Sequence, residues 1–221
     1  MLHKFTIYKP ILYSFLFSVL SSYTIYCVIS QQFYIQLNAN AISSFAYALI
    51  DTDVIMRVPL SILSIASFNL WTHNNKQISF IDVTSIFWTI IATTLYIIPN
   101  NRRLLSVVNI AFISFIIGAI ATDKDTPILC YYADNLIVLN ALIYTLCATI
   151  MASIYGINRN FLIGTSLSSL GYICKLLFIF MDQRWGTTVF HIITALGIQF
   201  LLKLYTTKEI LSIQLNNISI S

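Results

Sequence analysis

Residues 104–121 read LLSVVNIAFISFIIGAIA, a stretch of eighteen residues without a charged side chain. A helix of about 20 apolar residues crosses the hydrocarbon core of a bilayer. Inside lipid, a chain satisfies its backbone groups either as a helix or in a closed barrel. Barrel strands alternate apolar and polar residues over roughly ten positions, and this stretch does not alternate. It therefore predicts a transmembrane helix, and it sets the expected fold class: an all-α, polytopic membrane protein.

The composition of the whole chain indicates the same class. The 221 residues are 58% hydrophobic and 9% charged, whereas soluble domains carry about 25% charged residues. The net charge is +4, and no basic cluster exceeds Arg102–Arg103, so we expect no nucleic-acid partner. The four cysteines lie in or beside apolar runs without C-x-x-C spacing, which indicates neither a zinc ribbon nor a redox pair. The partner that the composition predicts is the lipid bilayer.

Similar apolar runs, separated by polar breaks, predict seven transmembrane helices in a single domain over 1–221, with a short polar tail at 206–221. The predicted spans are 11–30, 54–72, 80–98, 104–121, 133–155, 161–181 and 188–205. Residues 31–53 combine the polar QQFYIQLNAN with an apolar run too short to span, so we expect an interfacial or re-entrant piece there. Lys4 and Lys9 precede the first run as in a signal peptide, but that run is long enough to stay in the membrane uncleaved.

Ionisable side chains inside spans are costly, and they are functional candidates by default. In an alternating seven-span bundle, the end of span 2 and the starts of spans 3, 5 and 7 lie at one membrane face. Lys175, two-thirds along span 6, approaches the same face. The residues expected there are His73, Asp82, Asp134, Asp182 and His191.

Each of these residues also has a plainer explanation. Asp82 could cap the start of its helix, because a carboxylate is favoured at a helix N-terminus. Asp134 and Lys175 could neutralise each other as a structural ion pair, which would make both tolerable in the membrane. His191 alone could be a hydrogen-bonded packing residue. The functional interpretation therefore depends on the convergence rather than on one residue.

The chemistry open to such a cluster is metal-assisted hydrolysis. Neutral imidazoles and carboxylates bind zinc tetrahedrally, and a catalytic site keeps one position for water. The metal then activates that water and polarises the substrate carbonyl, while a neighbouring aspartate orients a histidine or the water. Three protein ligands are normally needed, and the chain has only three histidines, one of them His3 in the N-terminal tail.

Three short segments resemble the CREST superfamily of seven-span membrane hydrolase-like proteins, which includes alkaline ceramidases, progestin and adipoQ receptors and myomaker-like proteins. SIASFNLWTH ends span 2 with Ser67 and His73 at the motif positions, and FIDVTSIFWT opens span 3 with Asp82 and Ser85. DQRWGTTVFHIITALGIQFLL resembles the start of span 7, and its histidine is His191. The sequences of spans 3 and 7 most resemble the myomaker-like branch. The resemblance covers about 54–205.

The resemblance implies roles for four residues. His73 and His191 would be metal ligands, Asp82 would orient a histidine or water, and Ser67 would be a polar partner of the site. The chain departs from the pattern at Thr187, where the first histidine of His-x-x-x-His is missing. The spacing from Ser67 to His73 is also looser than the usual Ser-x-x-x-His. Asp182 is a candidate for the missing ligand.

Three classes of function follow from these observations. The first is a zinc-dependent hydrolase of lipid metabolism that acts on a lipid amide or ester. The second is a non-catalytic seven-span protein in membrane organisation, trafficking or fusion. The third is a small transporter or receptor with Arg57, Asp134 and Lys175 along a path, although the sequence lacks the paired, broken spans of inverted-repeat transporters. In each case we expect a multi-pass protein of an endomembrane (ER or Golgi) or the plasma membrane.

Overall fold

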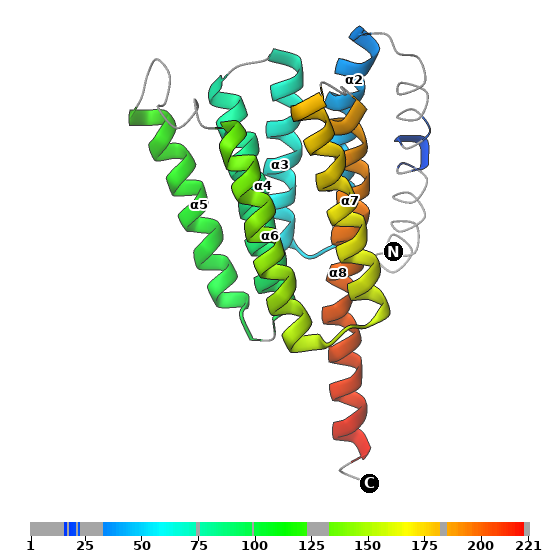
Figure 1. Ribbon diagram of the computed structural model, residues 1–221. Coiled ribbons are helices and arrows are strands. Elements are labelled where there is room, and N and C mark those ends of the chain that lie inside the picture. The colour runs from blue at the N-terminus through cyan, green and yellow to red at the C-terminus, as the bar shows by residue number, and fades with distance from the viewer. Residues whose placement is uncertain are drawn as a thin grey trace, which may run out of the picture.

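The structure is a computed structural model that describes residues 16, 18–20, 22, 33–73, 76–98, 100–122, 133–181 and 185–218. Every regular element in these ranges is helical, which confirms the predicted all-α class. The elements are α2 (Phe33–Ser43), η1 (Ser44–Leu49), α3 (Val54–His73), α4 (Lys76–Ile97), α5 (Arg102–Thr122), α6 (Ala133–Tyr155), α7 (Arg159–Met181) and α8 (Trp185–Ile218). They stand side by side as a bundle, η1 continues α2, and from this segment to α8 the successive elements run in alternating directions (Figure 1).

Five of the described helices are long and apolar enough to cross a membrane, which is consistent with an integral membrane protein. The apolar segments are Val54–Thr72, Ile78–Ile97, Arg102–Ala121, Arg159–Met181 and Trp185–Leu204. Helix α6 adds the apolar segment Leu139–Tyr155 within the residues whose side chains are described. The predicted first span at 11–30 lies almost wholly outside the described residues. The tail predicted at 206–221 is instead largely a continuation of α8, which ends at Ile218.

The segment predicted as interfacial or re-entrant runs through the bundle beside α8. Hydrogen bonds join the two elements from near the start of α8 to its middle, and each joins residues 147 or 148 apart in sequence, so α2–η1 and α8 run in the same direction. Eleven residues of α8 separate the first contact from the last, a depth of about 16 Å. The pairs are Asn40 with Thr188, Ser43 with His191, Tyr47 with Thr194, and Asp51 with Gln199.

The turn that follows this segment lies at the opposite end of the bundle from the start of α2. The Asp53 carboxylate lies 3.7 Å from the Arg102 guanidinium, at the turn between α4 and α5. The same carboxylate accepts hydrogen bonds from the backbone N–H groups of Ile55 and Met56 and so caps the start of α3. The chain therefore passes from one end of the bundle to the other between residues 33 and 53, and the interfacial or re-entrant placement of this segment in the membrane stays a prediction.

The conformation of the segment determines how far it extends along the bundle. The eleven α-helical residues rise about 1.5 Å each, and the six residues of η1 rise about 2.0 Å each as a 3₁₀ helix. Together they extend about 28 Å, close to the thickness of the hydrocarbon core. Arg57 donates to the carbonyl oxygens of Ala48, Ile50 and Thr52, and so satisfies the last carbonyls of the segment.

Helices α7 and α8 approach closely because small residues face each other along their contact. A Cβ atom at Gly197 would lie 2.8 Å from the carbonyl oxygen of Gly164, and one at Gly186 would collide with the carbonyl oxygen of Cys174. Small residues let transmembrane helices pack backbone against backbone. This contact fixes the position of α7 side chains against the first two turns of α8.

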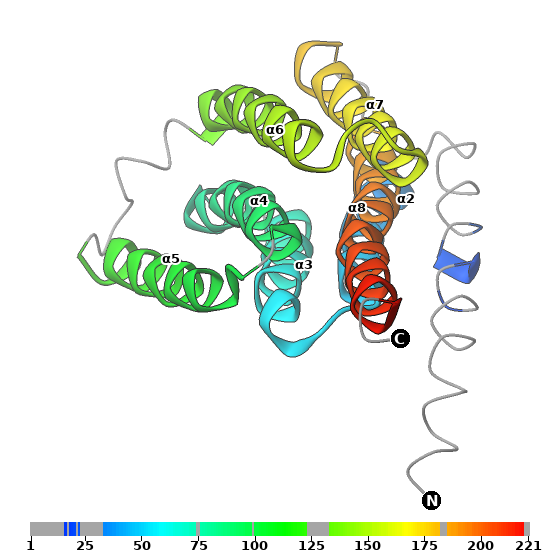
Figure 2. The ribbon, with the colours of Figure 1, turned by 90° about the horizontal axis from the view of Figure 1, so that it is seen from below.

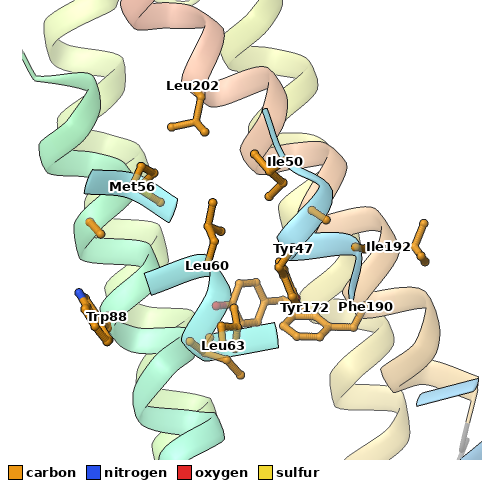
Figure 3. Close-up of a cluster of buried hydrophobic side chains, with 14 of the residues drawn as sticks. Tyr47, Ile50, Met56, Leu60, Leu63, Trp88, Tyr172, Phe190, Ile192 and Leu202 are labelled. Atoms are coloured by element: carbon orange, nitrogen blue, oxygen red, sulfur yellow. The ribbon is translucent and has the colours of Figure 1, made fainter. Parts of the chain in front are cut away.

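The bundle core is aromatic around this contact. Tyr47, Tyr172 and Phe190 gather from η1, α7 and α8, next to Leu60 and Leu63 of α3 (Figure 3). The rings of Tyr172 and Phe190 meet edge to face with centroids 5.4 Å apart. Seen from below, α5 stands at the edge of the bundle (Figure 2). It exposes large apolar side chains, as expected of a helix that faces lipid: Leu104, Val107, Ile110, Phe115 and Ile117.

A buried polar chain ties α5 and α3 to α4. The Trp88 indole N–H donates to Asn109 Oδ1 at 2.8 Å, and Asn109 Nδ2 donates to the Ile55 carbonyl at 2.9 Å. Trp88 is fully buried and stacks on Phe112 with the two rings 3° from parallel. Side-chain hydrogen bonds between transmembrane helices contribute about 0.6–2 kcal/mol each.

Asn109→Leu is therefore expected to lower the free energy of unfolding by about 1–3 kcal/mol, because it leaves the buried Trp88 N–H and Ile55 carbonyl unpaired. Unfolding of the purified protein in mixed micelles measures the change. Asn69→Leu is the matched control, since Asn69 is exposed and donates only to the Ile65 carbonyl of its own helix. Equal effects of the two substitutions would show that the Trp88–Asn109 chain contributes nothing specific.

Candidate functional site

Four polar side chains lie at one depth in the bundle. Each is six residues from the end of its helix at the same membrane face: Ser67 before the end of α3, Asp82 after the start of α4, Lys175 before the end of α7 and His191 after the start of α8. Six residues of helix correspond to about 9 Å. All four are buried, with exposed fractions of 0%, 3%, 4% and 2% respectively. The helix ends alone thus place them in one layer below the membrane surface.

His191 joins three elements through its ring. Its Nδ1 lies 2.9 Å from the Ser43 hydroxyl of α2, and its Nε2 lies 3.0 Å from the Ser67 hydroxyl of α3. The ring also packs edge to face against Tyr47, with centroids 5.8 Å apart. A neutral imidazole has one donor and one acceptor nitrogen, so His191 must donate to one serine and accept from the other.

Ser67 links His191 to Asp82, because its hydroxyl is also the polar neighbour that acts on the Asp82 carboxylate. Within the described residues, Asp82 Oδ1 has no hydrogen-bond partner. Ser67 has a single proton to give. When it donates to Asp82, His191 donates from Nε2 to Ser67 and accepts at Nδ1 from Ser43. When it donates to His191, the imidazole proton lies on Nδ1 and Asp82 loses its donor. The protons in this chain therefore shift together.

Lys175 brings a positive charge to the cluster. Its Nζ donates to Thr187 Oγ1 at 3.1 Å, and it is the charged neighbour that acts on Asp82. Three aromatic rings surround the ammonium at distances typical of cation–π contacts. The distances from Nζ to the ring centroids are 5.4 Å for Trp71, 5.0 Å for Phe178 and 5.9 Å for Phe190.

The structure brings together three of the four residues that the resemblance singled out. Ser67 lies next to both Asp82 and His191, and the catalytic or metal-binding roles of the three residues stay predictions. His73 is the last residue of α3, and its side chain lies outside what the structure describes. Six residues correspond to about 600° of helix, so His73 lies about 120° away from Ser67 around α3. The residue one turn beyond Ser67, on its own face, is Trp71.

The predicted pair of Asp134 and Lys175 stays a prediction, because the side chain of Asp134 lies outside the described part, as does all of Asp182. What the structure adds is a different neighbourhood for Lys175. Its described contacts are with Thr187 and the aromatic rings, and Asp82 is its acidic neighbour. Ser43 and Trp71 were missed altogether. Helical phase would have identified Trp71, whereas nothing in the sequence pairs Ser43 with a histidine 148 residues away.

Among the side chains that the structure describes, the donor set does not fit zinc. Both ring nitrogens of His191 already face serine hydroxyls, and the ammonium of Lys175 lies where a cation would balance Asp82. In the described part of the chain, His, Cys, Asp and Glu side chains form no group of three that could hold a metal ion. Zinc thus stays a prediction from the sequence, and the chemistry below is argued from the side chains alone.

A small cavity lies next to the cluster, between α4, α6, α7 and α8. It has a volume of about 40 Å³, and Tyr47, Phe190 and Thr194 separate it from His191. Three hydroxyl groups that face it are buried without a hydrogen-bond partner in the described residues: those of Thr89, Thr93 and Ser168. The volume and the polar partners suit one or two water molecules. The cavity is therefore a place for water close to the cluster.

Comparisons with known proteins add no relative from which a role could be transferred. No family model matches the chain, and no curated protein or solved structure matches it. The surroundings of Ser67, Asp82, Lys175 and His191 are therefore the observations that bear on function.

Proposed function

We propose that the chain is a seven-span membrane protein of the CREST hydrolase-like fold that cleaves a lipid amide or ester within the bilayer. The seven spans of the proposal are the predicted span at 11–30 and helices α3 to α8, and α2–η1 is a further segment that passes through the bundle. The observation that carries the activity is the Ser67 hydroxyl, held 3.0 Å from His191 Nε2 and next to Asp82 in a buried layer. Residence in an endomembrane (ER or Golgi) or the plasma membrane belongs to the same proposal.

The proposed chemistry uses His191 as a general base for Ser67. A hydroxyl within hydrogen-bond distance of an imidazole is the usual arrangement of an activated serine. Ser67 Oγ bonds to the substrate carbonyl carbon, its proton passes to His191 Nε2, and the carbonyl electron pair moves to the oxygen. The intermediate then expels the alcohol or amine, which takes the proton from His191. Water repeats the sequence on the acyl-serine and releases the acid.

Two neighbours prepare His191 for this role. Its Nδ1 faces the Ser43 hydroxyl, which in turn donates to the Asn40 carbonyl at 3.0 Å. In that arrangement the Ser43 oxygen accepts a hydrogen bond from the Nδ1–H group of His191. The Nε2 atom then carries no hydrogen and is directed at Ser67. When His191 carries its proton on Nε2, Ser67 can instead donate a hydrogen bond to Asp82. Asp82 thereby holds the hydroxyl in place between turnovers. Since the cluster is buried, the substrate enters only after helices move apart.

Cleavage by purified protein in liposomes tests the proposal, with ceramide and phospholipid as substrates. Ser67→Ala and His191→Ala are each expected to lower the rate at least 100-fold, the usual scale of base catalysis. Ser85→Ala is the matched control, because Ser85 is a buried serine of α4 that bonds only the Ile81 carbonyl of its own helix. Wild-type cleavage that survives Ser67→Ala would eliminate the mechanism.

A second function is favoured by one observation: both hydrogen bonds of the His191 ring join it to other helices. As a bridge between α2, α3 and α8, the cluster would act as a packing device in a non-catalytic protein of membrane organisation, trafficking or fusion. If this second function is correct, the wild type cleaves no lipid. Ser67→Ala should then lower the unfolding temperature. A transport path through Arg57 and Lys175 has less support, since Arg57 binds carbonyls at the far end of the bundle.

A further inference from the structure

We propose that the Lys175 ammonium is the resident cation of this cluster: it takes the place that a metal ion has in a zinc hydrolase and stabilises the oxyanion formed on the substrate. The second part of the inference rests on the proposed function, while the first part does not. It assigns Lys175 a role in the site that differs from the structural ion pair expected from the sequence.

The position of Lys175 Nζ supports the assignment. Thr187 lies one helical turn before His191 on α8, and Trp71 lies one turn after Ser67 on α3, so both share a face with a member of the cluster. The Nζ atom lies 3.1 Å from Thr187 Oγ1 and 5.4 Å from the centroid of the Trp71 ring. The ammonium thus reaches from α7 into the space between these two positions, where ligands from α3 and α8 would otherwise converge on a metal.

The charges of the cluster support it as well. Asp82 is buried and needs a positive neighbour, and Lys175 is that neighbour. A divalent ion at the same place would be strongly repelled by the ammonium, because Coulomb interactions in a buried, low-dielectric site are large. The rings of Trp71, Phe178 and Phe190 stabilise the ammonium through their faces and shield it from lipid. The positive charge of Lys175 therefore balances the negative charge of Asp82 without a metal ion.

The same position gives Lys175 a part in catalysis. Lys175 and Ser67 are both neighbours of the Asp82 carboxylate, so a carbonyl attacked by Ser67 develops its negative charge close to the ammonium. A preorganised cation directed at that oxygen lowers the barrier most effectively where water is excluded. An ammonium has three donors, and the approaching oxyanion competes with Thr187 for one of them.

Zinc content measures the first part directly and needs no substrate. The proteins to compare are the wild type, Lys175→Met, the double variant Trp71→His/Thr187→His, and the triple variant that adds Lys175→Met to the double. Each is incubated with zinc, dialysed and analysed by mass spectrometry, and cobalt absorption reports the ligand geometry. We expect about one zinc per chain, tetrahedrally bound, in the triple variant and none in the other three.

The outcomes separate cleanly. Stoichiometric zinc in the wild type or in the double variant overturns the inference, because the ammonium then does not take the place of the metal. A folded triple variant that binds no zinc also overturns it, since Nζ would then not mark a metal position. Folding of each variant is checked by its unfolding temperature and its elution as a single species. The wild-type measurement decides even if a variant fails to fold.

Cleavage assays test the second part. Activity of the wild type should survive 1,10-phenanthroline, and Lys175→Met should lower it about 100- to 1,000-fold, the effect of removing an oxyanion donor. Lys175→Arg should restore part of the loss, which a purely structural role for the charge would not require. Chelator-sensitive activity overturns the inference but leaves the hydrolase proposal standing. Absence of any cleavage removes the hydrolase proposal, and the zinc measurement then still decides the nature of the cation.

Discussion

Lys175→Met is expected to lower the free energy of unfolding by about 3–5 kcal/mol, because it leaves the buried Asp82 carboxylate without its positive neighbour. Adding Asp82→Asn should recover most of that loss, since replacement of both members of a buried pair is often close to neutral. Unfolding of the single and double variants in mixed micelles gives the coupling free energy between the two residues.

Lys203→Met is the matched control for this comparison. Lys203 is an exposed residue of the same bundle that contacts the Phe200 ring at 4.9 Å, so its loss should cost well under 1 kcal/mol. Additive effects of Lys175→Met and Asp82→Asn would contradict the coupling. The acidic partner of Lys175 would then have to be sought elsewhere, with Asp134 as the first candidate.

Gly197→Leu is expected to lower the free energy of unfolding by about 3 kcal/mol or more and to abolish any lipid cleavage. Its Cβ would lie 2.8 Å from the Gly164 carbonyl oxygen, a backbone atom that cannot move aside without separating α7 from α8. Because Lys175 is on α7 and His191 on α8, that separation also takes the cluster apart. The unfolding temperature and the fraction of monodisperse protein measure the effect.

Gly118→Leu provides the contrast for this substitution. Gly118 lies in α5, and a Cβ there would meet no atom within 4 Å, so the variant should be as stable as the wild type or slightly more stable, as expected when a helical glycine is replaced. Equal losses in the two variants would show that helix α7 is not held against α8 by close backbone contact.

The sequence predicted the membrane class and most helix positions because long uncharged runs have few alternatives in lipid. It also predicted that Asp82 and His191 would lie at one depth, since helix length alone fixes depth in an alternating bundle. For 31–53 it predicted an interfacial or re-entrant piece, because only 41–50 is apolar and that run is too short to span. The structure forms a helix through the polar residues before this run, and Asn40 has a buried partner there in Thr188 of α8.

The candidate site was only partly predictable for a related reason. His73 was chosen by residue type, although helical phase directs Trp71 rather than His73 to the face of Ser67. The depth of the candidate residues in the bundle was therefore predicted, but the direction in which each side chain leaves its helix was not considered. Lys175 was assigned to Asp134 because both are ionisable. Its contact with Thr187 depends on the close approach of α7 and α8, which no local pattern reports.

The contacts between α2–η1 and α8 constrain how the protein is made. Asn40 and Ser43 are buried in the finished bundle, and their partners Thr188 and His191 are synthesised almost 150 residues later. Until then these polar groups of α2 have no partner on α8, and an unsatisfied polar group is costly in lipid. Stable docking of α2–η1 is therefore a late step of assembly, which must wait until α8 has been inserted. A ribosome-bound chain that stops short of α8 should consequently leave α2 accessible to protease or to a cysteine-reactive label.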